Sequence, residues 1–235
     1  MQYPSSKLVV FCKAPEAGKV KTRLMNDLNQ LGLDGKTIAA KVHEYLARHI
    51  ISKMTKANLA TVELWCAPDT AHPFFQHCKN AYGVVLKEQG QGDLGKRMSR
   101  AFDEVLKDQD NAIVIGTDCP VYTVEQLQQA FELLKRTDCS VIAPAEDGGY
   151  PLLGLCETQD AIFQDIPWGS AKVFSETLAH MTGNVEILES LWDVDRLPDL
   201  IRLIKQSRKL ELAKEFIDYL DVLALNIGEE TERAL

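Results

Sequence analysis

Short apolar runs of strand length alternate along the chain with segments whose apolar residues recur at helical spacing. The run Lys7–Lys13 is rich in β-branched residues and apolar on both faces, and Ala112–Asp118 is the clearest strand. Strands are predicted over 7–13, 60–68, 84–88, 112–118, 139–147 and 150–155, and helices over 22–31, 37–55, 93–106 and 123–135. This βαβα rhythm predicts an α/β fold with a mainly parallel sheet and helices on both faces.

The C-terminal part of the sequence differs from the rest because it is almost entirely helix-forming. After Pro198 the helical pattern continues through Leu225. A length of 235 residues suits one domain, or one domain with a helical appendage. We therefore expect a single domain over 1–235, with a helical C-terminal extension from about residue 198.

Composition and charge narrow the class of protein. Hydrophobic residues make up 46% and charged residues 26% of the chain, an ordinary globular balance, and the formal net charge is −8. Because phosphate backbones favour a basic face, a nucleic-acid partner is not expected, whereas a small anion needs only a local cluster of Lys and Arg. The six cysteines form no C-x-x-C pair, and no signal peptide or apolar run of transmembrane length is present. We expect a soluble, cytoplasmic protein without disulfides or a membrane partner; the oligomeric state is left open.

The loop after the first predicted strand, Lys13–Leu24, is a candidate anion site. Gly18 relaxes the turn, and Lys19, Lys21 and Arg23 place positive charge where a helix begins. Free N–H groups and the helix dipole favour anions at that end, so cations there suggest a bound anion that offsets their repulsion. A solvated basic turn is the simpler alternative. The loop is not a Walker A motif, because Val20 follows Lys19.

A second loop carries Gly90, Gly92 and Gly95 in the G-x-G-x-x-G spacing of a dinucleotide-binding turn. Asp118 then lies at the end of the next strand, where a ribose-binding acid would stand. This pattern is the basis of an alternative function, an NAD(P)-dependent oxidoreductase. It is the weaker reading, since the fingerprint normally follows the first strand of the fold.

Carboxylates follow several of the predicted strands. Asp118 comes directly after an apolar strand, where burial without a partner is costly, and is a candidate ligand for Mg²⁺, which prefers one or two carboxylates plus phosphate oxygens. Asp147 precedes Gly148-Gly149 and is a candidate to orient an acceptor or a water.

Two further features complete the candidate chemistry. Asp193 and Asp195 share a face if their segment is extended, and Asp199 is a candidate helix cap. Trp168 stands in a loop-like setting, where it could stack on a sugar or base or anchor the core.

The histidines give no metal signature. His43 and His49 lie on the predicted helix 37–55, and no histidine spacing matches a zinc site. No Gly-x-Ser-x-Gly elbow occurs and no Cys stands beside a matching His, so nucleophilic hydrolysis has little support.

Taken together, the loops resemble one family. K-A-P-x-x-G-x-V-K-T-R-L, Q-G-x-G-D-L-G-x-R-M, G-T-D-C-P, E-D-G-G-Y and D-V-D-x-x-x-D-L occur in this order between Lys7 and about Leu200. The set is similar to the radical-SAM/selenodomain-associated transferases of the GT-A-type nucleotide-diphospho-sugar transferase superfamily, whose relatives include molybdenum-cofactor and phospholactate guanylyltransferases. The resemblance implies a three-layer α/β/α sandwich with a Rossmann-like sheet.

The resemblance also implies roles for individual residues. Asp118 and Asp195 would hold a divalent metal, Mg²⁺ or Mn²⁺, and Asp118, Lys21, Arg23 and Asp147 would be the catalytic set. The donor, a nucleoside triphosphate or a nucleotide sugar, would contact one group of residues and the small-molecule acceptor another. The donor group is Pro15, Gly18, Lys21, Arg23, Gln89, Gly92, Asp93 and Arg97, and the acceptor group is Gly148, Gly149, Tyr150 and Trp168.

Two departures from the family pattern bear on the reaction. The Asp-x-Asp of many glycosyltransferases is absent, because Cys119-Pro120 follows Asp118, and Pro151 follows Tyr150 where a small or aromatic residue is usual. The sequence predicts a metal-dependent transferase and leaves open glycosyl or nucleotidyl transfer, the base, the acceptor and the general base. A non-catalytic nucleotide sensor is a further alternative.

Overall fold

The computed structural model describes residues 1–136 and 139–233. One seven-stranded sheet runs in the order β3-β2-β1-β4-β6-β5-β7. Its strands are β1 (Ser6–Lys13), β2 (Thr61–Ala67), β3 (Val85–Glu88), β4 (Asn111–Gly116), β5 (Cys139–Ala143), β6 (Leu152–Leu155) and β7 (Asn184–Ile187). All pairings are parallel except those of β6, which lies antiparallel between β4 and β5. The predicted mainly parallel sheet is confirmed.

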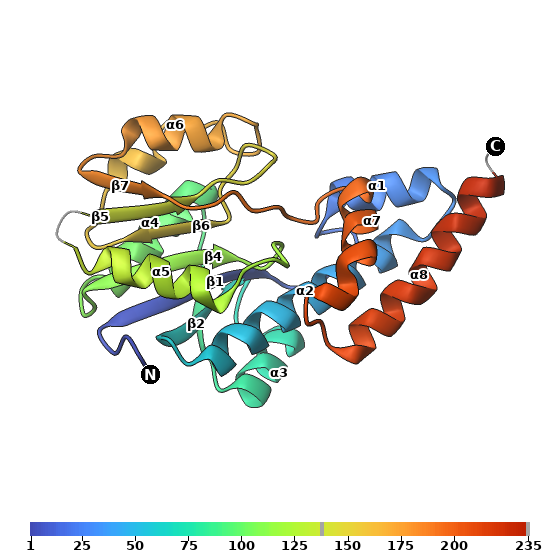
Figure 1. Cartoon of the computed structure of the whole chain (residues 1–235), viewed down its shortest axis with the longest axis horizontal. Helices are drawn as coiled ribbons and strands as arrows, with labels where there is room; N and C mark the ends of the chain where they lie inside the picture. Colours follow the sequence, from blue (N-terminus) through green and yellow to red (C-terminus); the bar gives the residue numbers. More distant parts are fainter. Residues whose placement is uncertain (137–138, 234–235) are drawn as a thin grey trace.

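Helices cover both faces of the sheet, and some of them lie beyond the carboxyl ends of its parallel strands (Figure 1). They are α1 (Thr22–Gln30), α2 (Gly35–Ala57), α3 (Pro73–Tyr82), α4 (Leu94–Val105), α5 (Val124–Leu134), α6 (Val173–His180), α7 (Leu197–Gln206) and α8 (Lys214–Arg233), with short 3-10 turns η1 (Asp160–Phe163) and η2 (Ser207–Lys209). Among the described helices, none combines the length and the apolar character needed to cross a membrane.

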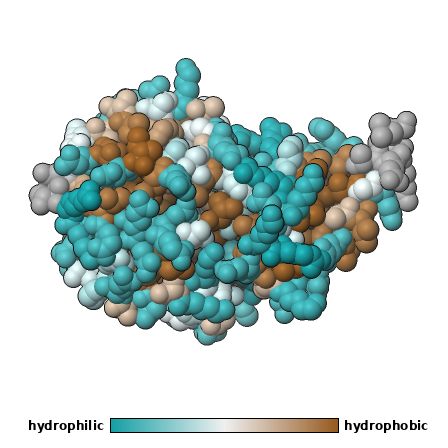
Figure 2. Space-filling view, viewed as in Figure 1, coloured by the Kyte–Doolittle hydropathy of each residue, from teal (hydrophilic) through white to brown (hydrophobic). Residues whose placement is uncertain are grey.

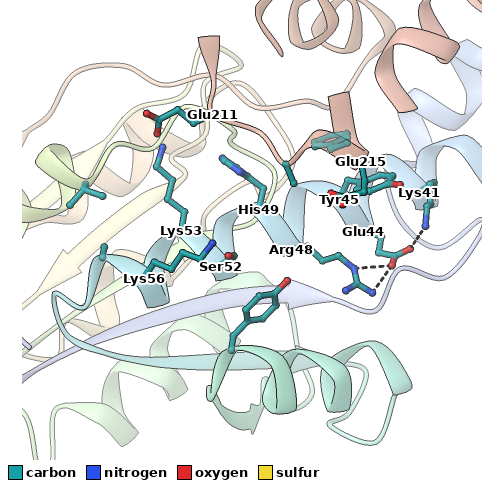
Figure 3. A pocket seen from close by; sticks show the side chains of 15 residues that line it. Lys41, Glu44, Tyr45, Arg48, His49, Ser52, Lys53, Lys56, Glu211 and Glu215 are labelled. Carbon is teal, nitrogen blue, oxygen red and sulfur yellow. Dashed lines mark hydrogen bonds and ion pairs between the residues drawn. The ribbon is translucent and has the colours of Figure 1, made fainter. Parts of the chain in front are cut away.

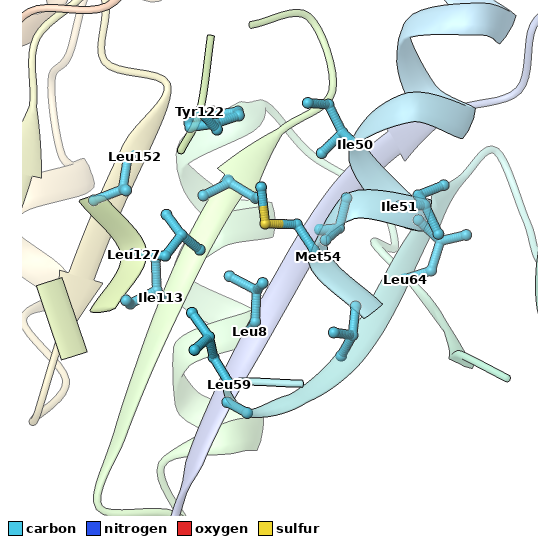
Figure 4. Packing of buried hydrophobic residues seen from close by; sticks show 14 of the residues in the cluster. Leu8, Ile50, Ile51, Met54, Leu59, Leu64, Ile113, Tyr122, Leu127 and Leu152 are labelled. Carbon is cyan, nitrogen blue, oxygen red and sulfur yellow. The ribbon is translucent and has the colours of Figure 1, made fainter. Parts of the chain in front are cut away.

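The core on one face of the sheet is built by α2, α3 and α5. Figure 4 shows Ile50 and Met54 of α2 lying against Leu8 of β1 and Ile113 of β4. On the other face, Met98 and other apolar residues of α4 pack with η1 on β1, β4 and β6. The sheet therefore has no solvent-facing side over its central strands, which explains why its strands read as continuous apolar runs.

A third cluster joins the C-terminal helices to the N-terminal ones. Leu24 of α1 and Leu46 of α2 are buried with Leu200 of α7 and Phe216 of α8. In Figure 1 these four helices lie together at the side toward which β1, β4 and β7 run. Figure 2 shows a mostly hydrophilic surface, with apolar areas toward the β7 end and toward α7 and α8, where Ile187, Val222 and Leu225 are exposed.

Two expectations from the hydrophobic pattern need correction, and three elements were not predicted. The predicted strand 139–147 ends at Ala143, because Pro144 has no N–H to donate to a ladder. The helical extension is interrupted at residues 207–213 and then continues to Arg233 rather than Leu225. The pattern did not identify α3, α6 and β7, which are short elements whose apolar residues make no sustained period.

Gly95 is required by packing between α4 and the segment before α6. A Cβ on Gly95 would come within 2.7 Å of a ring carbon of Trp168 and within 3.0 Å of the Phe163 carbonyl oxygen. Gly228, in the C-terminal half of α8, has no atom within 4 Å of the same position. Both glycines lie within helices, but only Gly95 has close neighbours at the position of an added Cβ.

Gly95→Ala is expected to lower the free energy of unfolding by about 1–3 kcal/mol, because the added methyl must displace the Trp168 ring or the backbone. Gly228→Ala is the matched control and should raise it by up to about 1 kcal/mol through helix propensity. Urea unfolding of the three proteins measures both values. Equal stability of Gly95→Ala and the parent protein would contradict the close packing.

Candidate functional site

The loops after β1 and β4 meet where the connections of the sheet change direction. From β1 the chain proceeds outward to β2 and β3, whereas β4 lies on the other side of β1 and leads toward β5, β6 and β7. In open α/β sheets, ligands bind outside the carboxyl ends of strands at such a switch point. Two cavities lie there, which we call the large edge cavity, of about 520 Å³, and the small edge cavity, of about 250 Å³.

The large edge cavity gathers most of the residues expected at the nucleotide. Pro15 and Gly18 belong to the same loop as Lys21 but do not line it. His43 of α2 also lines it, although it was not among the predicted site residues. The expected residues on its wall are Lys21, Arg23, Gln89, Gly92, Asp93, Arg97, Asp118 and Asp195.

The small edge cavity gathers most of the residues expected at the acceptor. Asp147, Gly149, Tyr150 and Trp168 line it, and the rings of Tyr150 and Trp168 meet edge to face at 6.3 Å. Gly148 does not line it.

The Gly148 backbone instead has φ of +89°, and a Cβ there would collide with the Ala171 carbonyl. The absence of a side chain at Gly148 therefore allows the segment that precedes α6 to pack closely against it. Asp118 lines both cavities, so they adjoin at its carboxylate.

Lys21 is the most constrained cation of the site. It occupies the left-handed region, with φ of 45°, at the residue before α1, and its side chain is only 2% exposed. The ammonium lies 2.6 Å from Asp118 Oδ1 and donates to the Val194 carbonyl at 2.6 Å. Because a non-glycine residue rarely adopts this conformation, the strained backbone and the buried ammonium together indicate a position under functional constraint.

Asp195 stands on the other side of Lys21. Its Oδ1 lies 3.9 Å from the Lys21 ammonium, and its Oδ2 lies 3.8 Å from the guanidinium of Arg23. Arg23 also donates to the Gly169 carbonyl at 3.1 Å, which ties the start of α1 to the loop of the small cavity. The two carboxylates offset the repulsion that cations meet at a helix N-terminus.

A backbone contact brings the segment of Asp195 to Asp118. The Val194 N–H donates to the Asp118 carbonyl oxygen at 3.0 Å, and upstream the Leu191 N–H donates to Pro144 O at 2.9 Å. The chain after β7 thus runs past the end of β5 and onto the end of β4. Asp199, the alternative candidate in this segment, accepts from the Arg196 and Asp195 N–H groups and caps α7.

The Asp118 carboxylate is held by two side chains. Desolvation would raise the pKa of this carboxyl, but the Lys21 ammonium and the hydrogen bond with His43 hold the pKa well below its usual range. His43 Nδ1 lies 3.3 Å from Asp118 Oδ1, while Nε2 lies 2.9 Å from the Lys13 carbonyl oxygen. Asp118 is therefore an anion at neutral pH, with 42% of its side chain exposed to the cavities.

Three other carboxylates form an acidic cluster beside Asp118. Oxygens of Asp147, Asp193 and Asp195 all lie within 4.8 Å of one another. Burial, followed by the charges of Asp195, Asp147 and Asp118, raises the pKa of Asp193 to about 7. Burial and Asp118 also raise the pKa of Asp195. Hard oxygen donors at this density suit a divalent cation of the Mg²⁺ type.

Two residues expected at the nucleotide have structural partners. Gln89 is buried and donates to the carbonyls of Cys12 and Trp65, so its amide joins the ends of β1 and β2. Its Oε1 accepts from Arg97, which also donates to Gly92 O. Asp93 caps α4 by accepting from the Lys96 N–H at 2.9 Å.

The glycine turn leads into α4 and does not follow the strand where a dinucleotide-binding loop is expected. Gly90, Gly92 and Gly95 follow β3, which is the edge strand of the sheet and not the strand at the switch point. A Cβ on Gly90 would collide with the Arg100 guanidinium, and Gly95 packs on Trp168. Close packing within the protein thus accounts for two of the three glycines.

Several solved structures are similar in fold to this protein, and three of them have names that state a transferase. A candidate nucleotide-diphospho-sugar transferase from Desulfovibrio desulfuricans G20 is 27% identical, with a TM-score of 0.83 over 97% of this chain and 98% of that one. A cytidylyltransferase from Leptospira borgpetersenii is 12% identical, with a TM-score of 0.56 over 96% of each chain. A nucleotidyl transferase from Methanothermobacter thermautotroptrophicus is 13% identical, with a TM-score of 0.53 over 84% and 95%.

These likenesses confirm the predicted GT-A-type α/β/α fold. No curated protein matches the sequence. Residues 50–170, more than half of the chain, match the family described as "uncharacterized protein conserved in bacteria" (DUF2064), and the protein therefore belongs to that family.

Proposed function

We propose that the protein is a metal-dependent transferase that takes a group from a nucleotide donor and passes it to a small-molecule acceptor. The observation that carries the proposal is the pair of cavities that adjoin at Asp118, one with cations on its wall and the other with aromatic rings. The name of the Desulfovibrio protein, and those of the nucleotidyltransferases with the same fold, support this class of reaction.

In this proposal the donor lies in the large edge cavity. Lys21 and Arg23 stand at the start of α1 and would bind the phosphates, because both offer N–H donors and positive charge where charge builds up on a leaving phosphate. Arg97, positioned by Gln89, would contact the base or ribose. The acceptor would lie between Tyr150 and Trp168 in the small edge cavity.

The carboxylates fit a divalent metal, Mg²⁺ or Mn²⁺. Asp118 and Asp195 flank the Lys21 ammonium and would hold the ion, with Asp193 and Asp147 close by. Such an ion would neutralise negative charge on the phosphates of the donor. The raised pKa values of Asp193 and Asp195 support this assignment, because crowded carboxylates favour binding of a cation.

Two versions of the reaction follow from the same geometry. In nucleotidyl transfer, an oxygen of the acceptor attacks the α-phosphorus of a nucleoside triphosphate and pyrophosphate leaves. In glycosyl transfer, the acceptor attacks a nucleotide sugar and a nucleoside diphosphate leaves. The cations Lys21 and Arg23 of the first loop and the absence of Asp-x-Asp favour nucleotidyl transfer. The narrower likeness to the radical-SAM/selenodomain-associated transferases favours sugar transfer and stays a prediction.

We also propose that residues 1–235 act as one domain, with the extension from about residue 198 as part of it. The cluster that joins Leu24 and Leu46 to Leu200 and Phe216 supports this proposal. The proximity of Asp195, just before α7, to Lys21 and Arg23 at the start of α1 supports it as well.

A thermal-shift screen across nucleotides, with and without Mg²⁺, tests the function most directly. A nucleotide that stabilises the protein only with metal supports the transferase, and the leaving group then separates its two versions. Stabilisation by NADH without metal would instead favour the oxidoreductase. Nucleotide binding without turnover of any acceptor would favour a sensor.

Lys21→Ala is expected to weaken binding of a nucleoside triphosphate by about tenfold or more while binding of the nucleoside changes little, because one charge-assisted contact is worth about 1.5–3 kcal/mol. Lys19→Ala is the matched control, since Lys19 lies in the same loop but is exposed and paired with Glu16. Calorimetric titration measures both affinities. Equal losses for nucleoside and triphosphate would mean that Lys21 does not bind phosphate.

Asp118→Asn is expected to abolish the enhancement of nucleotide binding by Mg²⁺, because a neutral amide is a poor ligand for a hard dication. Asp110→Asn is the control, since Asp110 is exposed just before the opposite end of β4. The variant also leaves the buried Lys21 ammonium without the carboxylate of its closest ion pair, so calorimetry is done below the melting temperature of the variant. Metal-dependent affinity that survives in Asp118→Asn would overturn the assignment.

A further inference from the structure

A third cavity, of about 770 Å³, lies away from the carboxyl edge of the sheet. We call it the helix cavity, because its walls are one side of α2 and the chain over 211–216 at the start of α8 (Figure 3). Tyr82 at the end of α3 and Val124 at the start of α5 complete the lining. It shares no lining residue with either edge cavity. The proposed transfer reaction leaves it unexplained.

The charges of the helix cavity are not balanced locally. Lys41 and Arg48 are both bound by Glu44, at 3.1 and 2.8 Å. Lys53 and Lys56 form no hydrogen bond or ion pair among the described residues. In a chain of net charge −8, two unpaired ammonium groups three residues apart on one helix are a local concentration of positive charge.

The carboxylates on the opposite wall form no ion pair with these two lysines. Glu211 and Glu215 come from the chain that faces α2, and Figure 3 shows Lys53 reaching toward Glu211. Neither glutamate lies within ion-pair distance of Lys53 or Lys56. The two walls therefore leave a polar gap between them rather than closing on each other.

His49 places an unsatisfied polar atom between the two walls. Its Nε2 is buried and has no hydrogen-bond partner among the described residues. Burial, and then the charge of Lys53, lowers the pKa of His49 to about 4, so the imidazole is neutral at neutral pH. A buried polar atom without a partner costs free energy, so the protein itself leaves the imidazole of His49 incompletely satisfied at this wall.

Aromatic rings form the remainder of the lining. The rings of Tyr45 and Phe216 stack at 4.8 Å with an interplanar angle of 8°, and Tyr82 stands on the side of α3. Rings with hydroxyl groups at their edges suit a ligand whose body is apolar and whose periphery is polar. The cavity thus combines cations with an aromatic wall, as sites for small organic anions do.

From these contacts we infer that the helix cavity binds a small organic phosphate, with its phosphate group at Lys53 and Lys56 and its organic part against Tyr82. A phosphate carries close to two negative charges, which matches two unpaired ammonium groups, and Lys binds phosphate as a point charge. A carboxylate would match the planar fork of an arginine better, and Arg48 is already engaged with Glu44. The inference does not rest on the proposed transferase activity.

The test uses phenyl phosphate as the probe, with binding measured by calorimetry. Lys53→Gln combined with Lys56→Gln is expected to weaken binding by about tenfold or more, because two charge-assisted contacts are lost. Lys36→Gln is the matched control, since Lys36 is exposed at the start of the same helix and outside all three cavities. Lys21→Ala removes the competing phosphate site at the carboxyl edge and should leave this binding unchanged.

The imidazole signal of His49, followed by NMR during the titration, places the probe independently of affinity. It should shift in the parent protein and in Lys21→Ala, and should not shift in the double variant. Unchanged affinity in the double variant, or a loss only in Lys21→Ala, would overturn the site. Benzoate binding as tightly as phenyl phosphate would contradict the preference for phosphate, and inorganic phosphate binding as tightly would contradict the role of the aromatic wall.

Discussion

The contact between Lys21 and Asp118 is the constraint on which the carboxyl edge of the sheet depends. An ammonium that is 2% exposed must have a partner, and Asp118 provides it at 2.6 Å. To reach that partner, Lys21 adopts a left-handed backbone at the start of α1, which fixes where α1 begins. The same ammonium binds Val194 O, so the segment before α7 is held at the same point. One cation thereby joins three parts of the chain that are far apart in sequence.

Because of this arrangement, the carboxylates at the carboxyl edge of the sheet have two different electrostatic environments. Asp118 has cationic neighbours and a lowered pKa, whereas Asp193 and Asp195 are crowded by other carboxylates and have raised pKa values. Cations lie toward the large edge cavity, and the acidic cluster reaches the small one through Asp147 and Asp193. A phosphate and a divalent cation would therefore find complementary charge within a few ångströms of each other, which neither loop offers alone.

The sequence predicted the fold well and the site in part. Continuous apolar runs identified β1 and β4 because helices cover both faces of these central strands, and helical period identified α5 because one of its faces packs on the sheet. It did not predict that β6 is antiparallel, since strand direction depends on a connection and not on a pattern. It could not show that Asp195 meets Lys21, because that contact depends on the path of the chain after β7.

His43 illustrates the signal that was available in the sequence. It is a polar residue between Val42 and Leu46 on the apolar face of α2, a position that requires a buried partner. The six residues from His43 to His49 rotate the helix by about 240°, so the two histidines face different cavities. Since His43 contacts Asp118 and His49 lies in the helix cavity, α2 lines both the large edge cavity and the helix cavity.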